Sequence, residues 1–294
     1  MHRFSRRDLV LLVLLTIFWG VNWPVMKLGV AEMPPLFFRA VFIGGGLVFI
    51  WAWARLTNVP LAVPPGAWPS IVKLAIPNVI VWHLLAIVAV KMLASGRAAI
   101  LGYTMPVWAV VFGVLIFKEH PLPRHWLGVV AALVGTLLLL SSEFTKLAGS
   151  PLGTILMLTA AAAWGYGTHL MRRSLTSMPT IALTFWMLTL TFIVMVVFSA
   201  AFELSRWRMP TAIEWASIVY NMAIAIGFCH VVWASMARNL PPAASGLSVM
   251  MIPVLGVFSG MLMLGEQPHW QDYAALVLIL VSLSTVLLPS RKVS

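Results

Sequence analysis

Two histidines lie inside long apolar segments of this sequence, where ionisable side chains are costly. His83 and His230 are 147 residues apart, and each is near the middle of such a segment. An imidazole can bind a carboxylate or exchange a proton near neutral pH, so a pair at matched positions indicates a polar site in apolar surroundings. The alternative is that both histidines are structural and hydrogen-bond to neighbouring helices.

Two tryptophans form a second matched pair. Trp19 and Trp164 are each followed by glycine, which lets another helix or a ligand approach closely. Tryptophan usually concentrates at membrane interfaces, but these two lie deeper in their apolar segments. Two indoles that face a cavity could stack on an aromatic or broadly apolar molecule, and ordinary helix packing is the alternative.

Two further polar side chains could face the same cavity. Asn22 lies one helical turn after Trp19, and Tyr103 precedes Met105-Pro106, where we expect a helix to kink and free a carbonyl. A hydrogen bond between helices is the more common role of each of them taken alone. The other intramembrane amides, Asn78 and Asn221, are interpreted as structural.

The composition determines which elements must carry these side chains. Of 294 residues, 61% are hydrophobic and only 9% are charged, against roughly a quarter charged in an average soluble domain. Apolar runs of about twenty residues recur, which is the length of a membrane-crossing helix. We therefore expect an all-α integral membrane protein with a single membrane domain over residues 1–294. Its ten transmembrane helices are expected near residues 9–30, 35–55, 69–91, 95–117, 124–141, 151–172, 179–202, 214–237, 243–264 and 270–289.

The net charge of +11 is interpreted as membrane topology rather than as a nucleic-acid footprint. Of the basic residues, twelve, among them Arg3 and Arg291, fall on the side of both termini, against seven on the other side. Arg39 is counted among those seven, as a charge near a membrane face. The positive-inside rule then places both termini in the cytoplasm. The expected location is the inner (cytoplasmic) membrane of the cell.

An internal repeat divides the chain. Residues 98–121 and 245–268 are identical at seven of 24 positions, including Glu119/Glu266. Each repeat contains five spans, an odd number, so the two copies must cross the membrane in opposite senses. Such inverted halves can expose a site at their interface first to one side and then to the other. The predicted halves are residues 1–146 and 147–294.

The repeated motif resembles the drug/metabolite transporter superfamily, in its ten-span EamA-type branch. Its two copies read Met105-Pro106-Val107 with Phe117-Lys118-Glu119-His120-Pro121, and Ile252-Pro253-Val254 with Leu264-Gly265-Glu266-Gln267-Pro268. The second copy departs from the family pattern farther on, at Ala274, Ala275 and Ser282. The Phe18-Trp19-Gly20 opening and the tryptophan content are similar to YddG-type exporters of aromatic and other amino acids. This resemblance implies export of a neutral amino acid with an aromatic or otherwise hydrophobic side chain.

Several kinds of chemistry lack the residues they need. The single cysteine, Cys229, excludes an intrachain disulfide and a paired-thiolate metal site. The acids lie near span ends rather than in mid-span, so carboxylate-based coupling to Na⁺ or H⁺ is not expected, and there is no nucleotide-binding motif. We expect no catalytic residue, metal or cofactor, and no nucleic-acid partner. The expected partners are a small-molecule substrate and the lipid bilayer, and the oligomeric state is left open.

These observations together predict an alternating-access transporter with a central cavity between its halves and facilitated movement of the substrate. Aromatic side chains would contact the apolar part of the substrate, and amide and imidazole groups would bind its polar groups. The predicted substrate-binding residues are Trp19, Asn22, His83, Tyr103, Trp164 and His230. Three alternatives stay open: a carrier of another metabolite or drug such as a nucleobase or lipophilic compound, a membrane-embedded enzyme that uses a histidine, and a structural subunit.

Overall fold

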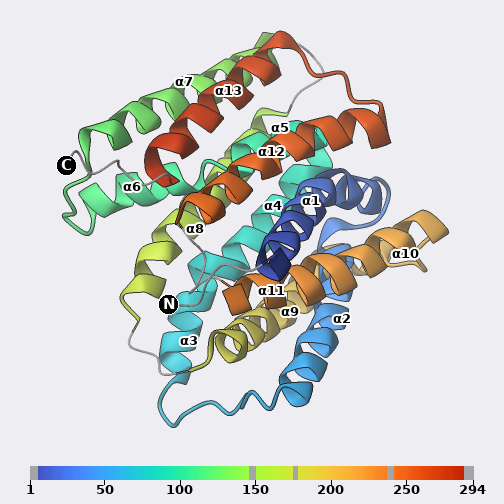
Figure 1. Cartoon of the computed structure of the whole chain (residues 1–294). Helices are drawn as coiled ribbons and strands as arrows, with labels where there is room; N and C mark the ends of the chain where they lie inside the picture. Colours follow the sequence, from blue (N-terminus) through green and yellow to red (C-terminus); the bar gives the residue numbers. More distant parts are fainter. Residues whose placement is uncertain (1–5, 146–149, 175–177, 237–241, 288–294) are drawn as a thin grey trace.

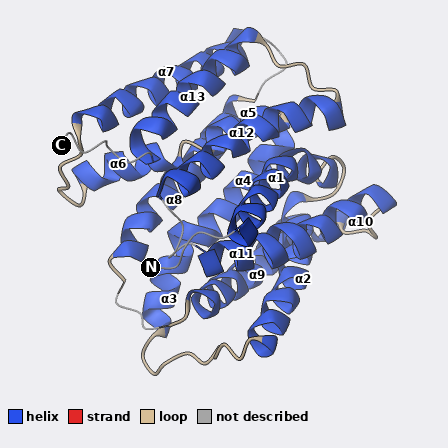
Figure 2. Cartoon of the chain, in the orientation of Figure 1, coloured by secondary structure: helices blue, strands red, loops and turns tan. Residues whose placement is uncertain are grey.

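Long helices run side by side through the computed structural model, which describes residues 6–145, 150–174, 178–236 and 242–287 (Figure 1). A helix, or a run of successive helical segments along one path, is called a column below. Within these residues the regular secondary structure is helical, and no strand occurs (Figure 2). A helix satisfies its backbone hydrogen bonds internally, as the hydrocarbon of a bilayer requires. The expected boundary after residue 146 and the terminal residues Arg3 and Arg291 lie outside the described residues.

The columns follow the order of the predicted spans, and several consist of more than one helical segment. Those of the first half are α1 (Arg6–Gly29), α2 (Pro35–Leu56), α3 (Trp68–Ala75) continuing as η1 (Ile76–Ile80) and α4 (Val81–Met92), α5 (Ser95–Gly102) followed by α6 (Met105–Leu115), and α7 (Pro123–Thr145). Those of the second half are α8 (Pro151–Arg172), α9 (Thr180–Glu203) ending in η2 (Leu204–Arg206), α10 (Ala212–Val219) continuing as η3 (Tyr220–Phe228) and α11 (Cys229–Met236), α12 (Pro242–Leu264), and α13 (Trp270–Leu287). Proline begins several of them, because it cannot donate a hydrogen bond and its fixed φ suits a first helical turn.

The lengths and apolarity of these columns confirm the all-α membrane fold class. Among the described residues, six helices are long and apolar enough to cross a membrane, and three shorter apolar helices accompany them. The six are Arg6–Gly29, Pro35–Leu56, Trp68–Met92, Ser95–Leu115, Thr180–Arg206 and Ala212–Trp233, and the shorter ones are Pro123–Leu139, Ser248–Leu264 and Trp270–Thr285. Helix α8 adds a further column of 22 residues. The count of ten membrane crossings stays a prediction.

Two columns contain a π-helical segment at corresponding places in the two halves. The segment η1 precedes His83 by a few residues, and η3 precedes His230 in the same way. A π-turn shifts the backbone hydrogen bonds to i−5, so carbonyls are left for other donors, and such turns occur often at functional sites. Asn221 is one such donor, since its Nδ2 binds the Ser217 carbonyl at 2.9 Å.

Two matched contacts join the halves of the chain. A Cβ built on Gly20 would lie 2.4 Å from Leu255 Cβ, so α1 and α12 touch at this glycine. A Cβ built on Gly165 would lie 2.7 Å from Trp108 Cβ, so α8 and α6 touch in the same manner. Trp108 and Leu255 are 147 residues apart, the offset of the internal repeat. The glycines that follow Trp19 and Trp164 therefore allow close helix contact, which brings both indoles near the other half.

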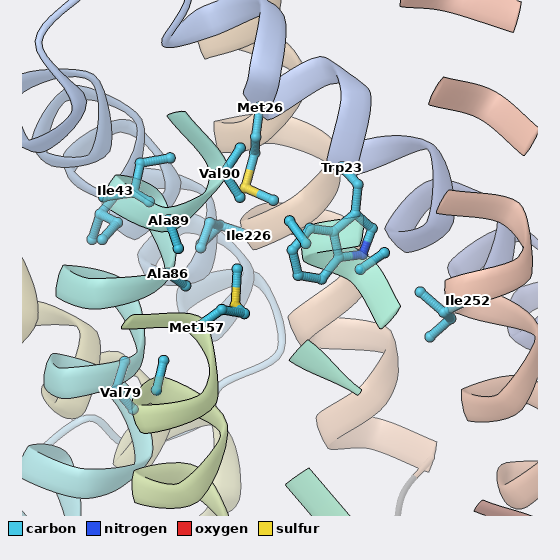
Figure 3. Packing of buried hydrophobic residues seen from close by; sticks show 14 of the residues in the cluster. Trp23, Met26, Ile43, Val79, Ala86, Ala89, Val90, Met157, Ile226 and Ile252 are labelled. Carbon is cyan, nitrogen blue, oxygen red and sulfur yellow. The ribbon is translucent and has the colours of Figure 1, made fainter. Parts of the chain in front are cut away.

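The core lies between α1, α2, α4 and their neighbours. Its largest fully buried side chains include Phe38 and Phe42 of α2. Figure 3 shows part of this cluster, in which Trp23 and Met26 extend from α1 among residues of other helices. Helices α7 and α13 pack along each other at one side of the bundle (Figure 1). The columns that carry the candidate residues are therefore those at the centre.

Candidate functional site

A cavity of about 700 Å³ lies among the central columns. Its wall is built from α1, α2, α4, the junction of α5 and α6, α8, η3, α11 and α12, so both halves contribute. This volume is within the range of about 300–1,000 Å³ that is typical of small-molecule pockets. The structure places all the predicted substrate-binding residues on this wall: Trp19, Asn22, His83, Tyr103, Trp164 and His230.

Aromatic pairs make up much of the cavity wall. The rings of Trp19 and His230 meet edge to face with centroids 5.8 Å apart, so α1 and α11 are linked at this point. Trp164 meets Trp82 in the same way at 5.4 Å. Edge-to-face contacts fix the ring planes and leave ring faces for other partners. The wall therefore offers flat apolar surface on both sides of the cavity.

One carbonyl in η3 orients two of the predicted residues. The Ala225 oxygen lies 2.8 Å from His230 Nδ1 and accepts a hydrogen bond from Trp19 Nε1 at 3.4 Å. Because a carbonyl can only accept, Nδ1 of His230 carries the hydrogen in this contact. The second ring nitrogen, Nε2, is then an acceptor in the neutral imidazole. The π-helical segment thus determines which hydrogen-bonding role His230 can take.

The predicted kink near Pro106 is confirmed. Helix α5 ends at Gly102 and α6 begins at Met105, and Tyr103 lies in the gap. Thr104 Oγ1 donates to the Leu101 carbonyl at 2.7 Å, which satisfies one of the groups that the break leaves free. The Tyr103 ring lies 6.4 Å from that of Trp23, centroid to centroid.

Arg39 and Asn221 are among the cavity residues that were not predicted as functional. Arg39 was counted as a charge near a membrane face, yet it lines the cavity and is only 4% exposed. Asn221 was interpreted as structural; it does bind its own helix, but it also lines the cavity. The Pro34-Pro35 pair could have located Arg39, since it marks the beginning of α2 and places residue 39 in the second turn of that helix.

Four buried polar atoms of this wall have no hydrogen-bond partner among the described residues. They are Asn22 Oδ1, Arg39 Nε, His83 Nδ1 and Asn221 Oδ1. Buried polar groups are normally paired, because an unpaired one loses its hydration without compensation. These atoms therefore indicate a cavity made for a polar occupant as well as an apolar one.

The cavity extends to one end of the bundle, near the turn between α6 and α7. Glu119 lines it there, and its side chain is 46% exposed. Glu119 Oε1 lies 3.2 Å from His169 Nδ1 and 3.4 Å from Arg173 Nη2. His169 also binds the Ala109 carbonyl through Nε2 at 2.7 Å, so one histidine links α8, α6 and the turn.

The opposite end of the bundle is held by the repeat mate of Glu119. Glu266 accepts hydrogen bonds from Ser95 N at 2.6 Å, Gly96 N at 3.2 Å and Ser95 Oγ at 3.0 Å. Arg97 and Asp272 form an ion pair beside it, with Nη2 2.8 Å from Oδ1 and side chains only 11% and 8% exposed. These residues are not among those that line the cavity. Protein contacts therefore join α5 to the chain segment before α13 at this end.

Comparison with known proteins assigns the chain to a family. A model of the EamA-like transporter family matches residues 7–141 and matches again over residues 151–288. The chain belongs to the EamA-like transporter family. It is therefore a multi-pass membrane transporter, and the predicted superfamily is confirmed.

Several relatives resemble this transporter over nearly its whole length. The uncharacterized transporter YoaV of Bacillus subtilis is 26% identical, with 87% of this chain and 88% of the relative covered. The uncharacterized inner membrane transporter YedA of Escherichia coli K12 is also 26% identical, over 95% of this chain and 92% of the relative. A probable amino-acid metabolite efflux pump of Salmonella typhimurium is 23% identical, over 95% and 94%.

A solved structure shares the fold of this transporter. That crystal structure aligns with a TM-score of 0.69 and 20% sequence identity over 96% of each chain. At this identity the likeness supports the arrangement of helices alone. The resemblance to exporters of aromatic amino acids stays a prediction.

Proposed function

We propose that this EamA-family transporter carries neutral amino acids, with a preference for aromatic or hydrophobic side chains, through the central cavity. The observation that supports this most is the mixed wall, where indole surfaces adjoin four unpaired polar atoms. An amino acid such as phenylalanine has the same two characters, a flat apolar group and a pair of charged groups. One relative carries the name of a probable amino-acid metabolite efflux pump.

In this proposal the six predicted residues divide the substrate between them. Trp19, Trp164 and Tyr103 contact its side chain, since aromatic faces stack on flat apolar groups. Asn22, His83 and His230 bind its polar groups. Movement is facilitated rather than ion-driven, because the lining residues include no acid near the centre of the cavity.

The proposed mechanism is alternating access between two inverted halves, residues 1–146 and 147–294. The reciprocal contacts of Gly20 with Leu255 and of Gly165 with Trp108 support this symmetry. So do the turns before the two glutamates, where Lys118 and Gly265 have φ of 57° and 65°. A two-fold relation lets each half take the conformation of the other, which moves the opening from one side to the other.

The conformation in this structure is proposed to be open toward the cytoplasm. The cavity reaches the end that contains the turn at Glu119, and the charge distribution places that end with both termini. In the opposite conformation Glu119 would bind the N–H of residue 243 at the beginning of α12, the repeat mate of Gly96, whereas the repeat mate of Ser95 is a proline and has no N–H to donate. The proposed direction in the inner membrane is export.

Counterflow into proteoliposomes of purified protein tests the proposed cargo. Labelled phenylalanine, tryptophan, methionine and threonine are offered with and without a pH gradient. We expect exchange that does not depend on the gradient, and at least about a tenfold loss when Trp164 or His83 is replaced by alanine. Trp51→Ala is the matched control, because this tryptophan is 46% exposed on the outside of α2.

The outcomes separate the proposal from its alternatives. Exchange of a nucleobase or lipophilic compound in place of amino acids would assign another cargo to the same cavity. Chemical conversion of a compound without its movement across a sealed bilayer would indicate an enzyme. The proposed binding site would be wrong if Trp19→Ala, Trp164→Ala and His83→Ala, expressed at wild-type levels, exchanged amino acids normally.

A further inference from the structure

The central cavity contains a buried cation for which the described residues supply no anion. Arg39 lies in the second turn of α2 and is 4% exposed. Its guanidinium lies 5.1 Å above the centre of the Phe42 ring, and Nη1 is 3.7 Å from the sulfur of Met26. Its Nε has no partner among the described residues. An uncompensated charge in a membrane interior is costly, so its presence at a cavity calls for a functional explanation.

The acidic side chains near the central columns are engaged elsewhere. Within the part of the chain that the structure describes, no carboxylate lies at ion-pair distance from Arg39. Glu203 lies at the end of α9, which packs against α2, and it accepts hydrogen bonds from Leu36 N at 3.2 Å and Phe37 N at 2.8 Å at the beginning of α2. The remaining contacts are Glu32 and Glu214 with Arg208, Glu119 with His169 and Arg173, Glu266 with α5, and Asp272 with Arg97. Within the described residues Arg39 is thus left without an anion, which an occupant of the cavity would supply.

Acceptors without donors lie on another part of the same wall. Asn221 donates its Nδ2 to the Ser217 carbonyl, which fixes the amide and leaves Oδ1 as an unpaired acceptor. His230 donates its Nδ1 to the Ala225 carbonyl, which leaves Nε2 as an acceptor. A primary ammonium group carries three donors and no acceptor, so it suits two such acceptors.

Resting on the proposed function, we infer that Arg39 anchors the carboxylate of the transported amino acid, while Asn221 Oδ1 and His230 Nε2 receive its ammonium group. The anchor belongs to one half only, since the offset of 145 residues that relates Trp19 to Trp164 pairs Arg39 with Thr184. The substrate therefore binds in one orientation. A lipophilic cation is repelled by the unpaired guanidinium, and a neutral nucleobase does not neutralise it.

A comparison of ligands that differ in one charged group tests this assignment. Purified protein is titrated with phenylalanine, 3-phenylpropionate, 2-phenylethylamine, succinate and adenine, and binding is followed by the shift in thermal unfolding. We expect the wild type to bind phenylalanine most tightly, to bind 3-phenylpropionate less tightly, and not to bind 2-phenylethylamine. Arg39→Gln is expected to lower the affinity for phenylalanine at least about thirtyfold, because a buried charge pair loses one partner. The control is Arg55→Gln, which removes an arginine from the exposed last turn of the same helix.

A structural role for Arg39 predicts a different result in the absence of ligand. If Arg39 only held the fold together, Arg39→Met would lower the unfolding temperature of the empty protein. The anchor predicts an unchanged or higher unfolding temperature, since methionine removes an uncompensated buried charge. The same variant is expected to lose the stabilisation that phenylalanine gives to the wild type.

The outcomes distinguish the anchor from the proposed cargo. Binding of carboxylates without an ammonium group but not of amino acids, lost in Arg39→Gln, would support the anchor and overturn the amino-acid function. Amino-acid binding that is equal in the wild type and Arg39→Gln would keep that function and overturn the anchor. The anchor is also overturned if only the amine or adenine binds, or if no compound stabilises the folded wild type.

Discussion

The turns at Glu119 and Glu266 have the same backbone and different surroundings. Glu119 N donates to the Gly113 carbonyl at 2.8 Å, and Glu266 N donates to the Gly260 carbonyl at 3.3 Å. The residue before each glutamate has a positive φ, 57° in one turn and 65° in the other. The repeat has therefore produced one local structure twice.

The side chains of the two glutamates are used differently. Glu266 binds the first residues of α5, where a carboxylate is stabilised by free backbone N–H groups and by the helix dipole. Glu119 forms ion pairs at the rim of the cavity and is 46% exposed. The backbone of the turn therefore does not determine what its carboxylate binds, and the residues that pack against the carboxylate do.

The largest expected effect is at the ion pair beside Glu266. Asp272→Ala leaves Arg97 without its nearly buried carboxylate and should cost about 3 kcal/mol of stability. Arg173→Ala at the other end removes an arginine whose side chain is 54% exposed and should cost less than about 1 kcal/mol. Thermal unfolding in detergent measures both. Equal losses would contradict the difference between the two ends.

Glu266→Gln should have the second largest effect, about 2 kcal/mol, because a charged acceptor of three hydrogen bonds becomes neutral. The end at α5 should then open. Ala98, fully buried in α5, is replaced by cysteine in a Cys229→Ala background, and its labelling by a membrane-impermeant thiol reagent is followed. We expect labelling several times faster with Glu266→Gln and no acceleration with Glu119→Gln. Acceleration by both would mean that the two glutamates are equivalent in this conformation.

Alanine substitutions of the two glycines that face the glutamates should differ by a smaller amount in their cost to stability. A Cβ on Gly260 would lie 2.6 Å from both Glu266 Oε2 and Ser95 Oγ, so Gly260→Ala must displace the cap and should cost about 1 kcal/mol. A Cβ on Gly113 would lie 3.0 Å from Glu119 Oε2, whose exposed side chain can move away, and 3.3 Å from Cε1 of the buried His169 ring, which needs to shift by only a few tenths of an ångström. Gly113→Ala should thus be tolerated. A larger loss of unfolding temperature for Gly113→Ala than for Gly260→Ala would reverse the comparison.

The sequence was sufficient to predict the helical membrane fold and to bring the six candidate residues to one cavity. Apolar runs report membrane helices directly, because the hydrocarbon admits no unpaired backbone. The Trp19/Trp164 and His83/His230 pairs were found because the repeat aligns them, at offsets of 145 and 147 residues. The family was indicated by the repeated motif that contains Glu119 in one copy and Glu266 in the other, and the family model confirms it.

Other features of the site depend on contacts that no pattern in the sequence encodes. Arg39 has no counterpart in the repeat and lies near a predicted span end, so it was interpreted as a charge near a membrane face. Asn221 was interpreted as structural because its place on the cavity wall depends on how η3 packs. Nor does an apolar run distinguish an α-helix from a π-helical segment, since both need the same residue types. The different partners of Glu119 and Glu266 are a property of the conformation, which a symmetric motif cannot reveal.

The smallest expected effect concerns the left-handed residue in each turn. It tests whether the fold or the local sequence determines the backbone conformation of the turns before Glu119 and Glu266. Lys118 has φ of 57°, a left-handed conformation that strains a residue with a Cβ, whereas its repeat mate in that conformation is Gly265. Lys118→Gly should relieve the strain and raise stability by about 0.5 kcal/mol, a small gain because glycine also loses more entropy on folding. The converse variant, Gly265→Lys, should cost about 1 kcal/mol. A gain for the first and a loss for the second, measured by thermal unfolding, would mean that both ends share a backbone imposed by the repeated helices. If Lys118→Gly destabilised the protein instead, the first turn would depend on its lysine, and the two turns would be alike for different reasons.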